Sequence, residues 1–510
     1  MSSDRPGSFA VHAACIRGVE AQPVTVEVSY GGSIPGITIV GMADSSVLEA
    51  RVRIRCALVA CGYDVPRRAI IVNLSPGDLR KTGSGFDLPI AVAILAMSGQ
   101  IPRTGLDSRL FVGEVGLDGE VLPCKGEVAY TLLARETGLS LVGALRQDHV
   151  PFDGVESTYL DSIGALRMGV DWACRPYPAL SQTESGPQLR LDYADVVGQE
   201  VAKRAIAVAA AGGLGMLMVG PPGSGKSMLA KRMTTILPPI DPVERQEALC
   251  IHSVAGDGYE GLLAGDRPFR RPHHSITPAG LVGGGRPVRP GEASLAHGGV
   301  LYLDELGEFP TGVLQTLRQP IEEGCVRIAR VDGTYVFPSR FQLLAASNPC
   351  PCGHLGDGEI ACRCTPSAIS KYRAKLAGPL VDRIDIVLDV ARPDPSLIIE
   401  GAEGLTSNDL LEMVERGRAF GRERAAKGAG ASFSGAGERL EHVIEQSGMQ
   451  GDSSDVLLDV AARNHLSARG IVRLCRIART VADIDQSPTI AVGHVLEAAM
   501  YQGRRSDGRM

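Results

Sequence analysis

The stretch that decides the fold is MLMVGPPGSGKSMLAK, residues 216–231, near the middle of the chain. Four apolar residues typical of a buried strand lead into a glycine-rich turn, and a helical pattern follows. The turn, GPPGSGKS (220–227), fits the phosphate-loop pattern G-x-x-x-x-G-K-[ST] in full. Its backbone N–H groups can curl around an anion at the start of a helix. The predicted nucleotide-binding residues are Gly220, Pro221, Pro222, Gly223, Ser224, Gly225, Lys226 and Ser227, of which Lys226 reaches the β- and γ-phosphates and Ser227 ligates Mg²⁺.

Two later apolar segments end in polar side chains suited to the same site. GVLYLDE (299–305) ends in Asp304 and Glu305. An aspartate there can hold the Mg²⁺ shell, and the adjacent glutamate can orient and deprotonate the attacking water. FQLLAASN (341–348) ends in Asn348, a candidate sensor of that water or of the γ-phosphate. The three segments together predict ATP hydrolysis.

The pattern around the phosphate loop predicts an α/β fold. From residue 193 to about residue 393, short apolar segments alternate with helical ones, which favours a parallel sheet covered by helices. Residues 1–175 also alternate, with helices expected at 45–62 and from Asp87 onward. After residue 396 the chain is expected to be mostly helical, near 407–427, 436–447, 453–465 and 467–485. The predicted domains are 1–180, a linker at 181–190, 191–395 and 396–510.

Composition limits the partners and the compartment. The chain has 510 residues and a formal net charge of −6, so a nucleic acid would have to meet a local basic feature. The longest apolar run, 88–97, is half the length of a membrane span, and the first residues show no signal-peptide core. Twelve cysteines without such a signal favour reduced thiols. We therefore expect a cytoplasmic protein without a membrane partner.

Four of the cysteines are grouped in CPCGHLGDGEIACRC (350–364). Cys350, Cys352, Cys362 and Cys364 suit a tetrahedral structural Zn²⁺, and the glycine-rich spacer lets the two pairs face each other. His354 is a possible substitute ligand. Because the spacing is not the common C-x-x-C, four reduced thiols in a loop remain the alternative.

A basic hairpin is predicted between the Glu305 and Asn348 segments. CVRIARVDGTYVF (325–337) contains two short strands, and Asp332-Gly333 is a strong hairpin turn. Arg327 and Arg330 lie on the arm that leads into the turn. Most ribbons of this kind are ordinary surface hairpins whose charges keep an edge soluble.

Several motifs together resemble a known family. DVVGQE (195–200), the phosphate loop, LYLDE, the Asn348 strand, LVDRID and SARG occur in the order seen in AAA+ ATPases of the magnesium-chelatase and MCM branch. FRRPHHSITPAGLVGGG (269–285), PGEASLAHGGVLYLDELGEFP (290–310) and SNPCPCG (347–353) resemble the bacterial YifB/ComM group. GSIPGITIVGMADSSVLEARVRIRCAL (32–58) and NLSPGDLRKTGSGFDLPIA (73–91) extend the resemblance over nearly the whole chain.

The resemblance implies further roles. Arg383 would be the arginine finger and Arg469 the second sensor, although spacing alone would make each a surface ion-pairing residue. Active members form rings, commonly hexamers, so ATP would lie between subunits, and the most similar proteins act in DNA branch migration. The hairpin would point into the ring pore, with Arg330 on DNA and Arg327 expected on the same face. Arg286 and Arg289 would form a second pore loop. A chelatase-type motor acting on a protein partner is the alternative.

The N-terminal region resembles the Lon protease domain, in an α+β fold of the ribosomal S5 domain 2 type. A Lon-like peptidase needs a serine nucleophile and a lysine base. Asp87 and Val128 stand at the matching positions, with Ser84 and Lys125 nearby. Because both dyad members are missing, we expect a structural or partner-binding domain, and peptidase activity is the weakest of the three hypotheses.

Overall fold

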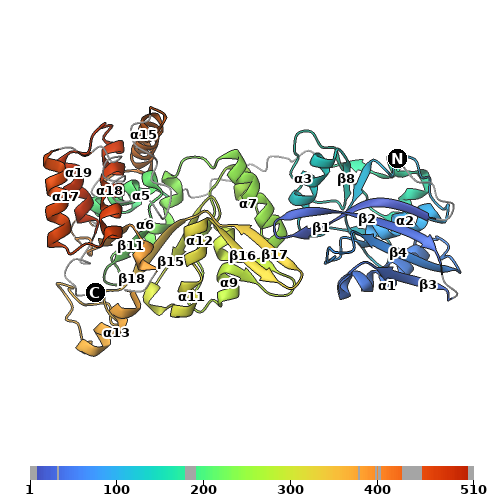
Figure 1. Ribbon diagram of the computed structural model, residues 1–510, viewed down its shortest axis with the longest axis horizontal. Helices are drawn as coiled ribbons and strands as arrows, with labels where there is room; N and C mark the ends of the chain where they lie inside the picture. The colour runs from blue at the N-terminus through green and yellow to red at the C-terminus, as the bar shows by residue number, and fades with distance from the viewer. Residues whose placement is uncertain are drawn as a thin grey trace.

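The computed structural model describes residues 8–31, 34–178, 191–376, 380–394, 396, 399, 404–427, 449 and 451–502. The molecule is elongated, and its three parts follow one another along the long axis (Figure 1). Residues 8–178 form one end, the phosphate-loop part lies in the middle, and helices after residue 404 form the other end. The predicted linker 181–190 and the predicted helix at 436–447 lie outside the described residues.

The N-terminal part is built on an eight-stranded mixed sheet of order β10-β9-β8-β5-β1-β2-β4-β3. Helices α1 and α2 cover one face of this sheet and α3 covers part of the other. Strands β6 and β7 form a separate two-stranded ribbon. The strands are β1 (Ser8–Arg17), β2 (Glu20–Tyr30), β3 (Gly36–Val40), β4 (Ala69–Ser75), β5 (Arg109–Phe111), β6 (Glu114–Val115), β7 (Val121–Leu122), β8 (Ser140–Gly143), β9 (Ser157–Tyr159) and β10 (Arg175–Pro176). The helices are α1 (Ser45–Ala60), α2 (Asp87–Met97), α3 (Glu127–Thr137), α4 (Val170–Ala173) and the 3-10 turn η1 (Ile163–Met168).

The central part contains a five-stranded parallel sheet of order β12-β15-β18-β11-β19. Alternate residues of β11 face opposite cores: Met216 and Met218 pack toward α5 and α6, and Leu217 packs toward α11 and α13. The strands are β11 (Met216–Val219), β12 (Phe269–Arg270), β13 (Gly283–Gly284), β14 (Arg289–Pro290), β15 (Val300–Leu303), β16 (Cys325–Arg330), β17 (Gly333–Pro338), β18 (Gln342–Ser347) and β19 (Ile386–Asp389). The α-helices are α5 (Glu200–Gly212), α6 (Lys226–Lys231), α7 (Pro242–Ala255), α8 (Glu260–Ala264), α9 (Pro278–Val282), α10 (Glu292–Leu295), α11 (Thr311–Gln315), α12 (Arg318–Glu323) and α13 (Pro366–Leu376). The 3-10 turns are η2 (Tyr193–Asp195), η3 (Met233–Ile236), η4 (Leu306–Glu308) and η5 (Val381–Arg383).

The C-terminal helices pack on the α5 side of the central sheet. They are α15 (Ser407–Ala426), α17 (Asp452–Arg463), α18 (Ala468–Ile484) and α19 (Val492–Met500). The first three match predicted segments. Helix α19 was not predicted, because it is short and follows the β-branched residues Thr489 and Ile490, which do not favour a helix.

The α/β prediction is therefore confirmed, with a parallel sheet around the phosphate loop and mostly helical structure in the described residues after 404. One local prediction was off by a residue. The hairpin turn is Val331-Asp332, because Gly333 pairs with Arg330 as the first residue of β17. In the part of the chain that the structure describes, no helix has the length and hydropathy needed to cross a bilayer.

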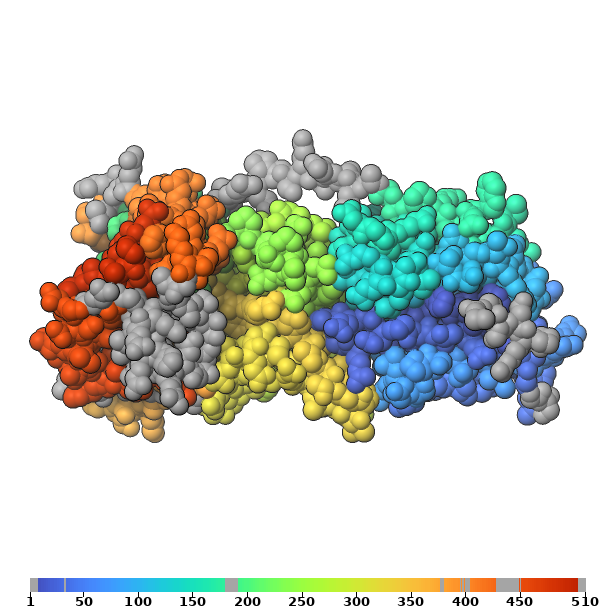
Figure 2. Space-filling view, turned by 45° about the horizontal axis from the view of Figure 1, so that its top comes forward, coloured from blue at the N-terminus to red at the C-terminus, as the bar shows by residue number. Residues whose placement is uncertain are grey.

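The N-terminal and central parts meet through a hydrophobic core of their own. Val128 and Leu132 of α3 pack with Ala248 and Leu249 of α7. The backbone N–H of Gly126 donates to Ser253 O at 3.0 Å, beside the end of α7. The space-filling view shows the two parts in direct contact at this boundary (Figure 2). The parts are thus docked on each other and not joined only by their connecting segment.

Candidate nucleotide site

The phosphate loop leaves the central sheet at the end of β11, which lies between β18 and β19. Gly220 lies so close to β19 that a methyl group in its place would be 2.1 Å from the Val390 carbonyl oxygen. Gly225 takes a left-handed φ of 85° directly before α6, which glycine adopts at little cost. The chain therefore folds as the pattern predicts, a strand, a tight loop and a helix N-terminus.

Lys226 points back into this loop. Its Nζ donates to the carbonyl oxygens of Gly220 at 2.7 Å and Pro221 at 2.9 Å. Burial lowers the pKa of Lys226, and the negative charges of Asp304 and Glu305 oppose that shift. A phosphate group would give the Lys226 ammonium a negatively charged partner, whereas the two carbonyl groups are neutral.

The end of β15 brings Asp304 to the first turn of α6. Ser227 Oγ donates to Asp304 Oδ2 at 3.1 Å, and the Tyr302 hydroxyl donates to Ser227 Oγ at 3.2 Å. A hydroxyl and a carboxylate at this spacing are hard oxygen ligands of the kind that Mg²⁺ prefers. Glu305 is next in the chain, has a left-handed φ of 52°, and its side chain is 58% exposed. Its carboxylate is thus accessible to water beside Ser227 and Asp304.

Two basic side chains of the site were missed by the motif analysis. Arg271 Nη2 lies 2.5 Å from Asp304 Oδ2, and His274 Nδ1 lies 3.8 Å from Glu305 Oε2. Both follow β12, which pairs in parallel with β15, so their segment leaves the sheet beside Asp304. The signal was present in FRRPHHS (269–275), where basic residues follow a short strand ahead of the acidic one.

Asn348 directly follows β18, the strand between β11 and β15. It therefore leaves the same edge of the sheet as the phosphate loop and Asp304. Ser347, before it, contacts the Tyr372 hydroxyl at 3.1 Å. The parallel order of the strands thus brings all three predicted polar segments to one edge of the sheet.

Arg383 and Arg469, the expected arginine finger and second sensor, lie outside the phosphate loop, on segments that contact each other. Arg383 belongs to η5 and pairs with Glu322 of α12, with Nε 2.7 Å from Oε1. Arg469 is exposed in the first turn of α18. The same helix reaches η5, because Arg473 Nη1 donates to Asp382 O at 2.9 Å and to Ile384 O at 3.2 Å. Within one chain, Arg383 is held by a carboxylate of its own subunit.

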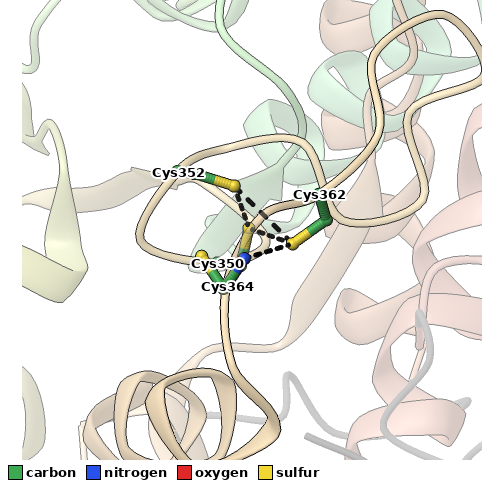
Figure 3. A group of neighbouring side chains, drawn as sticks. All are labelled: Cys350, Cys352, Cys362 and Cys364. Carbon is green, nitrogen blue, oxygen red and sulfur yellow. Dashed lines mark hydrogen bonds between the residues drawn. The ribbon is translucent and has the colours of Figure 1, made fainter.

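The four predicted cysteines converge (Figure 3). Sγ of Cys350 lies 3.4 Å from that of Cys352 and 3.7 Å from that of Cys362, and Cys352 and Cys362 are 3.6 Å apart. With Cys364, all four sulfurs lie within 4.8 Å of one another. Four sulfurs at about 2.3 Å from a zinc ion in a tetrahedron are about 3.8 Å apart. The donor set and its spacing fit Zn²⁺. His354, the possible substitute ligand, contacts Asp357 instead, with Nδ1 3.0 Å from Oδ2.

The basic ribbon β16–β17 lies against the second candidate loop. Gly283 of β13 faces Ile328, since a methyl group there would be 3.4 Å from Ile328 Cδ1, and one at Gly284 would be 3.9 Å from Arg330 Nη2. Arg286 and Arg289, in the β13–β14 hairpin, are exposed. The predicted basic hairpin and the predicted second pore loop, which forms the β13–β14 hairpin, are therefore neighbours.

The expectation that Arg327 and Arg330 share a face was wrong. They are three residues apart in a regular strand, and side chains alternate between faces with a period of two. Arg330 accordingly lies on the Ile328 face, toward β13–β14. Arg327 lies on the other face and pairs with Glu323, with Nε 3.4 Å from Oε2.

The ribbon tip also touches the N-terminal part, which sequence motifs did not predict. Arg17 Nη2 donates to the Asp332 carbonyl oxygen at 3.0 Å. A methyl group at Gly18 would lie 2.9 Å from the Val336 carbonyl oxygen, so the β1–β2 turn packs closely on β17. Figure 1 shows the ribbon extending from the central part toward this turn.

In the N-terminal part, the two positions aligned with the Lon dyad have other roles. Asp87 is fully buried and binds Arg53, with Nε–Oδ2 at 2.6 Å and Nη2–Oδ1 at 2.9 Å. Burial raises the pKa of Asp87, and Arg53 opposes the shift. Val128 lies in the hydrophobic core against α7, and Lys125 donates from Nζ to Ala255 O at 2.8 Å. Neither aligned position presents a nucleophile or a base to solvent.

Comparison with known proteins agrees with this geometry. Three family models match in succession: subunit ChlI of Mg-chelatase over residues 26–143, magnesium chelatase, subunit ChlI, over 192–397, and the C-terminal region of that subunit over 404–502. YifB of Salmonella typhimurium, named as uncharacterized, is 36% identical over 497 residues and 96% of each chain. Competence protein ComM of Haemophilus influenzae is 37% identical over 502 residues, 96% of this chain and 97% of its own. The chain belongs to the YifB/ComM family of magnesium-chelatase-like proteins.

A more distant relative of this YifB/ComM protein is the magnesium-chelatase 67 kDa subunit of Heliobacterium mobile, 31% identical over 199 residues, or 33% of this chain and 30% of that subunit. Membership indicates an AAA+ ATPase and implies the use of ATP and Mg²⁺. The Lys226 loop and the Ser227–Asp304 pair have the residue types that this use requires.

Proposed function

We propose that the protein is a ring-forming, ATP-driven motor that moves along or remodels DNA in branch migration, during homologous recombination or natural transformation. The observation that carries this is the placement of the two basic hairpins. In the chain, β13–β14 lies between β12 and the Asp304 strand, and β16–β17 lies between the Asp304 and Asn348 strands. The two hairpins touch each other. A movement of the strand ends that carry Asp304 and Asn348 can therefore move both hairpins. The name of the ComM relative, a competence protein, supports the same pathway.

The chain's own residues account for ATP binding and hydrolysis. Lys226 exchanges the Gly220 and Pro221 carbonyls for phosphate oxygens, because a full negative charge is the stronger partner. Ser227 and Asp304 would hold Mg²⁺, which neutralises phosphate charge when bound. Glu305 accepts the proton of the attacking water, and Asn348 orients that water.

The proposed ring supplies the remaining positive charge. Arg383 acts as an arginine finger on the ATP of a neighbouring subunit, for which it must leave Glu322. Arg469, exposed at the start of α18, serves as the second sensor. A heterologous interface of this kind closes into a ring when its rotation divides a full turn evenly.

The proposed DNA contacts are the exposed Arg330, Arg286 and Arg289, with Arg327 on the opposite face of the ribbon. Such a cluster binds phosphates without reading sequence, which suits a translocating motor and tolerates a net charge of −6.

The test is the ATPase rate of the full chain with and without single- and double-stranded DNA, at two salt concentrations. We expect DNA to raise the rate several-fold at low salt and less at high salt, because phosphate contacts release counterions. A rate that DNA leaves unchanged, in protein that hydrolyses ATP, would remove the support for a DNA motor.

A second candidate, a chelatase-type ATPase that remodels a protein partner, is favoured by the three ChlI family matches and by the 67 kDa subunit relative. Active ATP hydrolysis that is insensitive to DNA would make this the first choice. A Lon-like peptidase role has no supporting residue at Asp87 or Val128.

We further propose that Cys350, Cys352, Cys362 and Cys364 hold a structural Zn²⁺. Four protein ligands leave no open position for catalysis. Elemental analysis of protein from zinc-replete cells should give about one zinc per chain, and the Cys362→Ser, Cys364→Ser double variant should lose the zinc and melt at a lower temperature. If the parental protein is fully folded and contains no metal, the four cysteines are reduced thiols in a loop and not a zinc site.

A further inference from the structure

The cysteine loop, residues 349–364, packs directly on the phosphate loop. Gly353 has a left-handed φ of 85°, and a methyl group at this position would lie 2.6 Å from Pro222 Cδ and 2.8 Å from Pro222 Cγ. The same methyl group would be 3.8 Å from Asn348 Cγ. One residue of the cysteine loop thus packs closely on the phosphate loop and lies beside the candidate sensor.

A second set of contacts ties the cysteine loop to the segment after β19. Asp357 Oδ2 lies 3.1 Å from Arg392 Nη2, and Glu359 Oε2 lies 3.0 Å from Arg392 Nη1. Gln199 joins the neighbouring backbone to the phosphate loop, since its Nε2 donates to Ala391 O and, at 3.5 Å, to Ser224 O. The loop therefore connects the ends of β11, β18 and β19, which are neighbours in the central sheet.

Between Cys350 and Cys364 the chain has no helix and no strand. Its shape depends on the four converging sulfurs, on Gly353 packing and on the Arg392 ion pairs. The Arg392–Glu359 pair is weak, because the Glu359 side chain is largely exposed and water screens its charge. A metal bound by four thiolates would therefore be the strongest constraint on where Gly353 lies.

We propose that this loop is a metal-dependent clamp on the phosphate loop. With a thiophilic divalent cation such as Zn²⁺ bound to the four cysteines, Gly353 stays against Pro222 and the phosphate loop keeps the curl that receives ATP. Without the cation, the loop leaves Pro222 and Asn348, and nucleotide affinity falls. The inference rests on the proposed ATP site and adds a regulator to it, the occupancy of the cysteine cluster.

The experiment measures metal content by elemental analysis and the Kd for MgATP by calorimetry, for the full-length parent and four variants. The Cys362→Ser, Cys364→Ser variant should carry no metal and bind ATP about tenfold more weakly or worse. Gly353→Ala should keep the metal but also bind ATP about tenfold more weakly, because its methyl group displaces the loop from Pro222. Gly358→Ala is the matched control, since nothing lies within 4 Å of its methyl group. It should behave as the parent in both measurements.

The clamp would be overturned if the folded, metal-free double variant, or Gly353→Ala, bound ATP with the affinity of the parent. It would also be overturned if the parental protein contained no metal. If the double variant does not fold, Gly353→Ala against Gly358→Ala decides alone. Lys226→Ala separates this outcome from failure of the ATP site itself. If Lys226→Ala loses ATP binding while the loop variants bind ATP like the parent, only the clamp is refuted. If Lys226→Ala still binds ATP like the parent, the ATP site on which the clamp rests is refuted.

Discussion

At the scale of single residues, Asp304 and Glu305 are adjacent in the chain but have different surroundings. Asp304 is held by Ser227 and Arg271, whereas Glu305 has a left-handed backbone and an exposed carboxylate with His274 at 3.8 Å. The two carboxylates can therefore be tested separately, one as a metal ligand and the other as the base that activates water.

Glu305→Gln should leave ATP binding and assembly intact and reduce turnover at least about a hundredfold, because it removes the base and spares the Mg²⁺ ligands. Lys226→Ala should instead weaken ATP binding itself. Steady-state hydrolysis and equilibrium binding of labelled ATP distinguish the two. Parental turnover in Glu305→Gln would refute the assignment.

His297 gives a prediction about pH. It is fully buried, accepts from the Arg340 backbone N–H at Nδ1 (3.1 Å) and contacts Glu247 Oε2 through Nε2 at 2.9 Å. Burial, and then Arg340, lower the pKa of His297 to about 4, below the usual 6.5. Above pH 6.5 both folded and unfolded states hold a neutral ring. As the pH falls from 6.5 toward 4 the unfolded state takes up a proton and the folded state does not, so stability is lost, roughly 3 kcal/mol in all.

Urea midpoints at pH 7, 6 and 5 measure this loss. His297→Gln can still accept from Arg340 and donate to Glu247 but cannot titrate, so it should be less stable at pH 7 and lose less stability on acidification. Equal slopes in parent and variant would show that His297 does not cause the acid sensitivity.

At the scale of elements, β16–β17 has three different surroundings. One face lies on β13–β14 through Ile328 and Arg330, the other carries the Arg327–Glu323 pair, and the tip rests on Arg17. The helical segment 311–323, which leads into this ribbon, is divided into α11 and α12. Pro320 in α12 has no N–H to bond to Thr316, in the break between them.

Arg330→Ala should keep basal ATP hydrolysis and assembly but lose most of the stimulation by DNA, with a weaker salt dependence of the binding that remains. Arg327→Ala is the natural comparison, because the same charge is removed from the opposite face of the same strand. Its effect should be smaller. A double variant that binds DNA like the parent would identify the ribbon as an ordinary surface hairpin.

At the scale of the whole molecule, the N-terminal part contacts the central part at two sites, the α3–α7 core and the ribbon tip. A movement of the ribbon therefore acts on the β1–β2 turn as well. The C-terminal helices reach η5 through Arg473, so Arg383 lies where these helices meet the central part. This is the part of the molecule that the proposed ring brings to a neighbour's ATP.

Mixing two inactive proteins tests whether Arg383 acts between subunits. Arg383→Ala and Glu305→Gln subunits should each be inactive alone and should regain part of the parental ATPase rate when mixed, because one kind of interface then carries both intact groups. Mass photometry must show that both variants enter the same assemblies. A mixture that stays inactive although mixed assemblies form would contradict a role in trans.

The sequence by itself determined the phosphate loop and the polar ends of β15 and β18. Each is encoded in fewer than ten consecutive residues, and parallel strands bring their carboxyl ends to one edge of a sheet. The same holds for the cysteine cluster, whose members are close in the chain. Only the tertiary structure decided which residues from other segments join them: Arg271 on Asp304, Gly353 on Pro222, and Arg17 on Asp332. The residues of these pairs are 33, 131 and 315 positions apart. No local periodicity relates residues so far apart, because their contact depends on how the sheets and helices pack and not on the conformation of either segment alone.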